Sequence, residues 1–480
     1  MRVAMGYSMG QKYLAFFLQV VVTVVLARLL TPAETGIFSL AVAVVGLGNM
    51  LRDFGTAEYV ISQKDVTQDK LRAAFTVTVL MAWGIALLLL LLAQPLAALY
   101  KEAGVGRALQ LLCVNFVLLP FGSVAFAMLS KEMQFGRIFA AQTSANLVGA
   151  AVTLWAAWDG YSYMSLAMGS VAANCWTIFI LLFLEPTRVF LKPTYRGLGN
   201  VVRFGGALTA ARLIEQSANR SGDFIVNGLL GFHAGGLMSK TSSLIGSFHE
   251  FFASAVVRVA TPAFAKTDAT STAERQGYLQ GTVLVGTALW LFFPFLAVYA
   301  HEIVLLMFGT NWLECVPLLK LTAASSVAWG PFMLSASLLT ARGAVAQQMR
   351  IQLVMAPLTV AALLTGAMID LFTMFVLLSS VQLVRFYMIA TAMRVVCGIR
   401  FQEVMLELRP SALLAAIALT GSGLAKWTAV TAGWPAFFVL AFGGLAMTVL
   451  AGIAALWLRH PLYHEAVRMK EYLIARRLKQ

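Results

Sequence analysis

The chain has 480 residues, of which 60% are hydrophobic and only 12% are charged, and its formal net charge is +14. Soluble globular proteins of this size do not have such a composition. The longest predicted connections, 185–203 and 261–278, are shorter than twenty residues. These features exclude a water-soluble protein and argue against a receptor or membrane-tethered enzyme with a large domain outside the bilayer.

The predicted elements are apolar stretches of helical length, about fourteen in number, and each is close to the roughly 20 residues that a helix needs to cross a bilayer. In chain order they are 13–30, 37–60, 73–93, 108–129, 138–158, 163–184, 204–222, 236–260, 279–299, 315–340, 351–369, 371–393, 411–430 and 434–457. The continuous apolar run at 87–92 excludes the alternating pattern of a barrel strand. Since only helices or closed barrels satisfy every backbone group in lipid, the sequence predicts an all-α polytopic membrane protein.

The basic residues are distributed unequally between the two sides of this predicted membrane protein. If the N-terminus is cytoplasmic, the cytoplasmic ends and loops carry twenty-five lysines and arginines, and the opposite loops carry Lys101, Arg107 and Lys426. This bias predicts that both termini are cytoplasmic. The positive charge then reflects topology and contact with anionic membrane lipids, and it does not indicate a nucleic-acid partner.

The chain also contains a predicted internal repeat. Residues 29–40, LLTPAETGIFSL, align with residues 229–240, LLGFHAGGLMSK, with four identities in twelve positions. Apolar helices align weakly by chance, but these identities favour a true repeat. Both halves begin on the cytoplasmic side, which predicts parallel repeats related by an axis along the membrane normal, an arrangement found in secondary transporters. The predicted domains are a six-helix lobe at 1–196, a second six-helix lobe at 197–400, and two extra transmembrane helices with a basic cytoplasmic tail at 401–480.

Two pairs of local motifs resemble a known family. The stretches LARLLTPAETGIFSLA (26–41) and DFGTAEYVISQ (53–63) are similar to the first helix junction of Wzx-type polysaccharide flippases. The stretches GDFIVNGLLGFHAGGL (222–237) and VVRVATPAFAK (256–266) resemble the pattern that opens their second lobe. These flippases belong to the multidrug/oligosaccharidyl-lipid/polysaccharide exporter superfamily. The resemblance implies a bacterial inner-membrane transporter that moves polyprenyl-pyrophosphate-linked oligosaccharide by alternating access.

Polar residues within the predicted spans are candidates for function, because a charged side chain at mid-bilayer costs about 2.5–3.5 kcal/mol on insertion scales. Lys240, Ser243, Ser247 and Glu250 recur every three or four residues and therefore share one helical face. This pattern favours a polar cavity over the alternative that Lys240 extends to the membrane interface. In the span 204–222, Arg212 and Glu215 are spaced i,i+3, which fits a structural ion pair as well as a cavity wall.

The predicted substrate-binding residues are basic or hydroxyl-bearing side chains inside the membrane. They are Arg28, Arg52, Arg212, Arg220, Lys240, Ser243, Ser247 and Arg385. Guanidinium groups match phosphate oxygens bidentately, so this cationic interior favours a pyrophosphate substrate over a cationic drug. The side chains of Asn49, Gln142 and Asn146 could bind the sugars.

The acidic residues inside the predicted spans are candidates for coupling transport to a proton or cation. Asp53 adjoins Arg52, and Glu215 lies near Arg212, so both are predicted to be structural ion-pair partners. Glu250 lies among the serines and is the better candidate for a switch.

No enzyme, cofactor or metal site is predicted. The sequence has no P-loop motif ending in Lys-Ser or Lys-Thr. The pair His460 and His464 is predicted to lie in a basic tail on the membrane surface rather than to bind metal. We therefore predict a flippase for lipopolysaccharide O-antigen, capsule or exopolysaccharide, with glycan polymerase machinery as a further candidate partner. The alternatives are an ion-coupled drug exporter of the same superfamily and a membrane polysaccharide polymerase or ligase.

Overall fold

The computed structural model describes residues 2–52, 55–62, 67–194, 198–199, 220–266, 272–461 and 463, and over these residues it contains helices and no strands. The chain divides into two compact units, Met1–Ser239 and Lys240–Gln480. Each unit has its own apolar core, and each is described by itself below.

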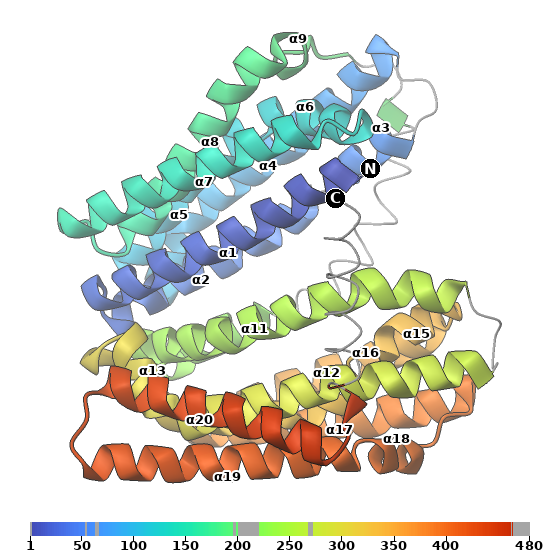
Figure 1. Ribbon diagram of the computed structural model, residues 1–480. Coiled ribbons are helices and arrows are strands. Elements are labelled where there is room, and N and C mark those ends of the chain that lie inside the picture. The colour runs from blue at the N-terminus through green and yellow to red at the C-terminus, as the bar shows by residue number, and fades with distance from the viewer. Residues whose placement is uncertain are drawn as a thin grey trace, which may run out of the picture. The chain divides into compact units, whose positions relative to one another are not determined.

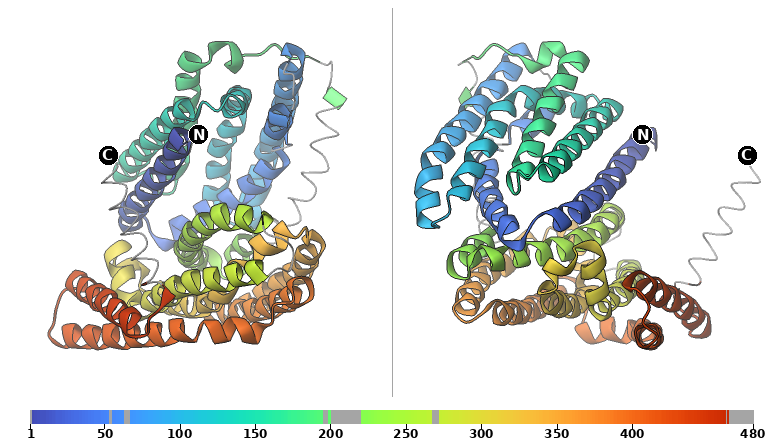
Figure 2. Two further views of the ribbon diagram at one scale, coloured as in Figure 1. Left: turned by 45° about the vertical axis from the view of Figure 1, so that its right-hand side comes forward. Right: turned by 90° about the vertical axis from the view of Figure 1, so that its left-hand side faces the viewer.

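The first unit consists of helices, and its long helices lie along one another (Figures 1 and 2). They are α1 (Arg2–Leu29), α2 (Pro32–Arg52), α3 (Thr56–Ser62), α4 (Gln68–Leu99), α5 (Ala103–Leu118), α6 (Pro120–Lys131), α7 (Phe135–Trp158), α8 (Met164–Leu184) and α9 (Pro186–Val189). Residues 220–229 are also helical. Helix α7 packs on α8, and α4 packs on α5. Leu40, Leu109 and Phe116 are fully buried in the core between these helices.

The second unit contains most of α11 (Gly231–Ala265), from Lys240 onward, and this helix begins in the first unit. The remaining elements are α12 (Thr272–Val298), α13 (Ala300–Met307), η1 (Thr310–Trp312), α14 (Cys315–Ser326), η2 (Val327–Phe332), α15 (Ser335–Ala341), α16 (Val345–Ala367), α17 (Leu371–Cys397), α18 (Phe401–Glu407), α19 (Arg409–Thr431) and α20 (Ala436–Trp457). Helices α19 and α20 form an antiparallel pair (Figure 1).

Within the described residues, nine helices are long and apolar enough to cross a membrane, and the bent pair α5–α6 makes a tenth if it is one span. The prediction of an all-helical multi-pass membrane protein is therefore confirmed. The count of fourteen spans stays a prediction, since 204–219 lies outside the described residues.

Three predicted spans have internal breaks that the apolar pattern does not reveal. The span 37–60 is two helices, because α2 ends at Arg52 and α3 follows Gly55, which has a positive φ of 63°. The span 108–129 is the pair α5–α6, bent by 49°. The span 315–340 is α14, the 3₁₀ segment η2 and α15.

The motif at 29–40 forms a helix start. Thr31 Oγ1 accepts from the backbone N–H of Glu34, and Glu34 Oε2 accepts from the backbone N–H of Thr31 at 2.7 Å, which is a capping box. Pro32 occupies the first helical position, where its missing N–H costs nothing. Ser162 donates to the other oxygen of Glu34. The motif thus fixes the start of α2 and joins it to the turn before α8.

The two aligned motifs contact each other within the first unit. A Cβ atom on Gly36 would lie 2.0 Å from the carbonyl oxygen of Phe232, and a Cβ atom on Gly236 would lie 1.8 Å from the carbonyl oxygen of Pro32. Glycine is therefore required at both positions for this backbone approach. The two contacts are reciprocal in the register of the repeat, since Gly36 aligns with Gly236 and Pro32 with Phe232.

Three arginines near helix ends are bound to carboxylates. Arg137 and Arg188 both pair with Glu185, at 2.6 and 3.1 Å, and Arg188 also pairs with Glu132 at 2.7 Å. The hydrogen bond from Arg188 holds the pKa of Glu132 below its usual value. In the second unit, Arg342 pairs with the buried Glu274. Three of these ion pairs, Arg137–Glu185, Arg188–Glu132 and Arg342–Glu274, thus join the ends of helices that are distant in the sequence.

The predicted surface position of His460 is wrong. Its side chain is fully buried, and Nε2 lies 3.0 Å from Ser411 Oγ on α19 and 3.3 Å from Thr287 Oγ1 on α12. Burial lowers the pKa of this imidazole. The chain after α20 thus returns to the helices of the second unit at this residue.

The close approach of Gly36 to Phe232 gives a direct test of this packing. Gly36→Ala forces a methyl group into a backbone carbonyl, and we expect a loss of about 1–3 kcal/mol in stability, as for other overpacked sites. Gly84→Ala is the matched control, because a Cβ there meets nothing within 4 Å and alanine favours a helix. Thermal unfolding in detergent should show a lower transition for Gly36→Ala alone; equal transitions for both variants would contradict the packing.

Candidate functional site

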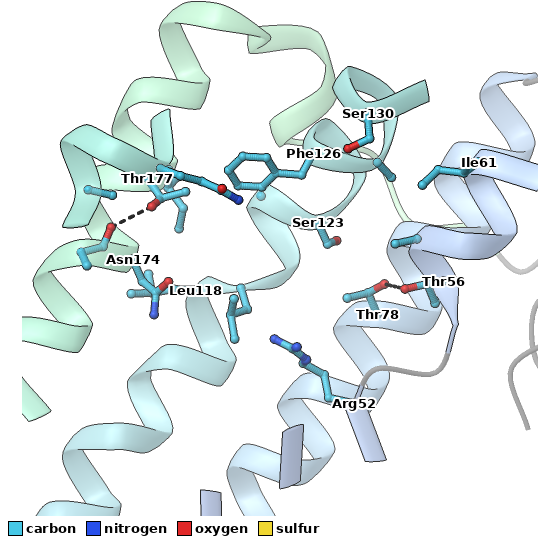
Figure 3. Close-up of a pocket in the computed structure, with 18 of the residues that line it drawn as sticks. Arg52, Thr56, Ile61, Thr78, Leu118, Ser123, Phe126, Ser130, Asn174 and Thr177 are labelled. Carbon is cyan, nitrogen blue, oxygen red and sulfur yellow. Dashed lines mark hydrogen bonds between the residues drawn. The ribbon is translucent and has the colours of Figure 1, made fainter. Parts of the chain in front are cut away.

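The first unit contains a polar cavity of about 620 Å³ at the junction of α5 and α6 (Figure 3). Its walls come from the end of α2 and from α3, α4, α6, α7 and α8. The polar lining residues are Arg52, Thr56, Thr78, Ser123, Ser130, Gln142, Asn146, Asn174 and Thr177. The volume lies within the range of about 300–1,000 Å³ that is typical of small-molecule sites.

The cavity exists because the fifth helix is broken. Pro120 has no N–H group to continue the hydrogen-bond ladder of α5, so α6 departs from the axis of α5 by 49°. The indole N–H of Trp83 donates to the carbonyl of Val117 at 3.3 Å, which satisfies one group released by the break. Leu118, Gly122 and Ser123 then line the space beside the bend.

Hydrogen bonds fix several polar groups around this space. Asn174 donates its amide to Asn115 Oδ1 at 2.8 Å, and Asn115 donates to Ser170 Oγ at 2.6 Å. On the opposite wall, Thr78 donates to Thr56 Oγ1 at 3.2 Å. These contacts hold the side chains in place, so the wall presents amides and hydroxyls in a fixed arrangement, as a polyhydroxylated ligand requires.

Arg52 is the charged residue among the described residues of the lining. It is the last residue of α2 and is half-buried. Figure 3 shows its guanidinium extending from the end of α2 toward Leu118. A guanidinium among neutral hydroxyl and amide groups can bind a phosphate or carboxylate of a ligand whose remaining surface is hydroxyl-rich.

The structure brings three of the sequence-selected residues into this one cavity: Arg52, Gln142 and Asn146. Arg220 lies in the same unit but not in the lining; its Nε is 3.4 Å from the position of a Cβ on Gly46 of α2. Six residues of helix separate Gly46 from Arg52, which is about 9 Å along α2. Arg220 therefore contacts α2 about 9 Å along the helix from Arg52.

The sequence predicts that Lys240 lines a polar cavity, but its ammonium group contacts aromatic rings. Its ammonium lies over the rings of Phe308 and Trp312, 5.5 and 5.4 Å from their centroids. Cation–π contacts of this kind are favourable where the cation is shielded from water. They compensate the cost of the charge within the second unit, so a substrate role of Lys240 stays a prediction.

The face of α11 that carries Ser243, Ser247 and Glu250, called the serine stripe below, is the more exposed side of that helix. Ser243 and Glu250 are exposed and Ser247 is half-buried, whereas Leu244 and Ile245 are buried. In the second unit, the polar face that the spacing predicts therefore lies on the exposed side of α11.

The other candidates are dispersed. Arg28 is exposed in the last turn of α1, and Arg385 is half-buried on α17. Three candidates, Asp53, Arg212 and Glu215, lie outside the described residues.

Sequence reasoning missed the residues that the helix break brings together, above all Ser123, Asn174 and Thr177. Two signals were present. Pro120 within a predicted span indicates a kink, and the amides of Asn115 and Asn174 in apolar stretches require partners in lipid. In the part of the chain that the structure describes, no group of histidine, cysteine or acidic residues could hold a metal ion.

Comparison with known proteins gives a consistent result. Residues 25–317, more than half of the chain, match the family described as polysaccharide biosynthesis protein. The chain is 24% identical over 301 residues to the lipopolysaccharide biosynthesis protein WzxC of Escherichia coli (strain K12), covering 62% of this chain and 61% of that protein. It is 24% identical over 326 residues to the succinoglycan biosynthesis transport protein ExoT of Rhizobium meliloti (strain 1021), covering 67% and 65%. The matches thus span less than two thirds of the length of these relatives.

A solved structure shares the fold. The lipid II flippase MurJ in an inward closed conformation superposes with a TM-score of 0.72 at 9% identity, covering 95% of this chain and 99% of that one. At this identity the similarity establishes the fold alone.

If the cavity at the α5–α6 bend is hydrated, a thiol placed in it should react with a water-soluble reagent, because only the thiolate reacts and it needs water. We expect Ser123→Cys to be modified much faster than Leu88→Cys, whose side chain is exposed on α4 outside the cavity. Both variants are made in a background without the four native cysteines and are measured in lipid nanodiscs, where both faces are accessible. Equal and slow modification of the two would contradict a polar cavity.

Proposed function

The chain is a member of the polysaccharide biosynthesis protein family, and from this premise we propose that it is a flippase for polyprenyl-pyrophosphate-linked oligosaccharide units in surface polysaccharide biosynthesis. It acts as a transporter and not as an enzyme. The names of WzxC and ExoT, which refer to lipopolysaccharide biosynthesis and to succinoglycan transport, support this substrate class.

The observation that carries the proposal is the position of Arg52 in the polar cavity. The guanidinium provides a site for a pyrophosphate or an acidic sugar, and the hydroxyl and amide groups around it suit a saccharide. A cationic drug would be repelled by the same arginine, so the geometry favours the oligosaccharide over the drug-exporter alternative. A polymerase or ligase would need catalytic groups, which the described lining does not offer.

The reciprocal glycine contacts support the proposed repeat. In a two-fold arrangement, residue i of one copy contacts residue j of the other, and j of the first contacts i of the second. The contacts Gly36–Phe232 and Gly236–Pro32 follow this rule with a constant offset in the sequence. We propose fourteen spans, arranged as six-helix lobes at 1–196 and 197–400 and two helices with a basic tail at 401–480, with alternating access between the lobes.

Further residues complete the proposed site. Besides Arg52, the proposed substrate-binding residues are Arg28, Arg212, Arg220, Lys240, Ser243, Ser247 and Arg385. The exposed carboxylate of Glu250 on the serine face of α11 supports a coupling role for it. Asp53 and Glu215 remain proposed ion-pair partners with a secondary coupling role. The protein is proposed to lie in the bacterial inner membrane and to deliver its cargo to glycan polymerase machinery.

The role of Arg52 is tested by polysaccharide export. Arg52→Ala removes a charge-assisted contact of about 1.5–3 kcal/mol, roughly ten- to a hundredfold in affinity. Arg52→Lys should restore export only in part, because the bidentate fork is lost. Surface polysaccharide is measured in a deletion strain complemented with each variant at matched protein level.

Arg350→Ala is the control, since Arg350 is exposed on α16 and does not line the cavity. Full export by Arg52→Ala, or full restoration by lysine, would contradict a phosphate-binding role. Normal export together with a loss of drug resistance would favour the drug exporter.

The proposed topology is tested by cysteine labelling at positions 190 and 475. The unequal distribution of basic residues predicts that both positions face the cytoplasm. A membrane-impermeant thiol reagent added to intact cells should therefore leave both cysteines unmodified and should modify them after the membrane is opened. Modification of either one in intact cells would contradict the assignment.

A further inference from the structure

The second unit contains a groove that the proposed transport site does not use. It has a volume of about 1040 Å³ and is bordered by α12, α14, η2, α17 and α18. Three exposed apolar side chains mark it on the surface: Leu383 is 60% exposed, Tyr387 is 74% exposed and Phe401 is 46% exposed. The groove is therefore open, apolar and large enough for a ligand.

One wall of the groove is a stack of three phenylalanine rings from three elements. The ring of Phe332 on η2 lies between Phe386 on α17, at 5.3 Å and 8°, and Phe401 on α18, at 5.8 Å and 5°. On another side, the indole of Trp290 is fixed by a 2.8 Å hydrogen bond to the carbonyl of Val327. These rings form a rigid apolar surface that is suited to an acyl chain.

The other end of the groove is cationic. Arg394 in the last turn of α17 and Arg400 just before α18 both line it and are exposed, and Gln402 adds an amide. The lining residues that the structure describes include no carboxylate. The nearby Glu403 is already paired with Arg275. This end of the groove therefore offers two guanidinium groups to an anion.

The spacing of the two ends matches a lipid. Along α17, Phe386 lies about 12 Å from Arg394 and Leu383 about 16 Å. Helix α17 has 27 residues, or about 40 Å, which exceeds the hydrocarbon core of about 30 Å. Arg394, three residues from the helix end, therefore lies at headgroup depth, and Phe386 and Leu383 lie at the depth of acyl chains.

We propose that this groove binds one anionic phospholipid, with its phosphate at Arg394 and Arg400 and an acyl chain along Phe386, Phe332 and Phe401. Charge complementarity selects this occupant, because basic pockets between transmembrane helices bind anionic headgroups, whereas a zwitterionic lipid would bring its own cationic group close to the two guanidinium groups. The bound lipid bridges α17, α18 and η2, the elements that contribute the stacked rings.

Native mass spectrometry of the full chain tests the site. Dioleoyl phosphatidylglycerol and dioleoyl phosphatidylcholine share acyl chains and differ in net charge, so they are added in separate titrations. We expect one phosphatidylglycerol to be retained per chain at least tenfold more tightly than phosphatidylcholine. Arg394→Gln with Arg400→Gln should abolish this preference, while Arg409→Gln, an exposed arginine outside the groove, should keep it.

Filling the groove tests the acyl-chain part separately. Ala390→Trp places an indole in the groove and should abolish retention of phosphatidylglycerol, whereas Val395→Trp, which is exposed on the same helix outside the lining, should not. Unchanged retention in the arginine double variant, or equal retention of the two lipids, would overturn the proposal. Displacement of phosphatidylglycerol by an equimolar polyprenyl phosphate would overturn it as well, since the groove would then belong to the substrate.

Discussion

The structure depends on one constraint: a polar group within the bilayer must find a partner in the protein or in trapped water. The described helices meet this constraint in three ways. Asn115 satisfies its amide on Ser170 and Asn174. Lys240 places its charge on two aromatic rings. Arg52 lies at the wall of a cavity, which a ligand or water can enter. Access from a cavity, rather than the lack of a protein partner, distinguishes a candidate for transport from a structural residue.

The same break in a helix serves packing and function. Pro120 ends the ladder of α5, and the resulting bend of 49° opens the space that α2, α3, α7 and α8 enclose. Without the bend, the residues Ser123 and Ser130 would continue along the axis of α5 and would not line this space. The cavity is thus a consequence of backbone chemistry at one residue, and the polar side chains around it define which ligands it suits.

The sequence was sufficient for properties that depend on local pattern. Apolar runs of the required length located α4, α7, α8, α12, α19 and α20, and the motif at 29–40 marked a boundary that proved to be a capping box. Periodicity also placed Ser243 and Glu250 on one face of α11. The alignment of 29–40 with 229–240 identified the two glycines that meet partner backbones, although it did not reveal the contacts.

Properties that depend on distant contacts were not accessible from the sequence. The aromatic partners of Lys240 lie about 70 residues downstream, so Lys240 resembled an unpaired cation in a serine stripe. The residue His460 follows the last span and resembled part of a surface tail, but Ser411 and Thr287 hold it in the interior. The cavity unites Arg52 with Asn174 across 122 residues, and no local pattern encodes that proximity.

We propose that this chain moves a lipid-linked saccharide headgroup across a membrane. The most direct measurement uses proteoliposomes that contain a fluorescent polyprenyl-pyrophosphate-linked oligosaccharide and follows how much of the headgroup becomes accessible to a membrane-impermeant quencher. Vesicles with the protein are expected to expose the inner-leaflet pool faster than protein-free vesicles, and free oligosaccharide is expected to compete weakly. Identical rates of headgroup exposure in the two kinds of vesicle, together with uptake of a cationic drug by the vesicles with the protein, would contradict a flippase.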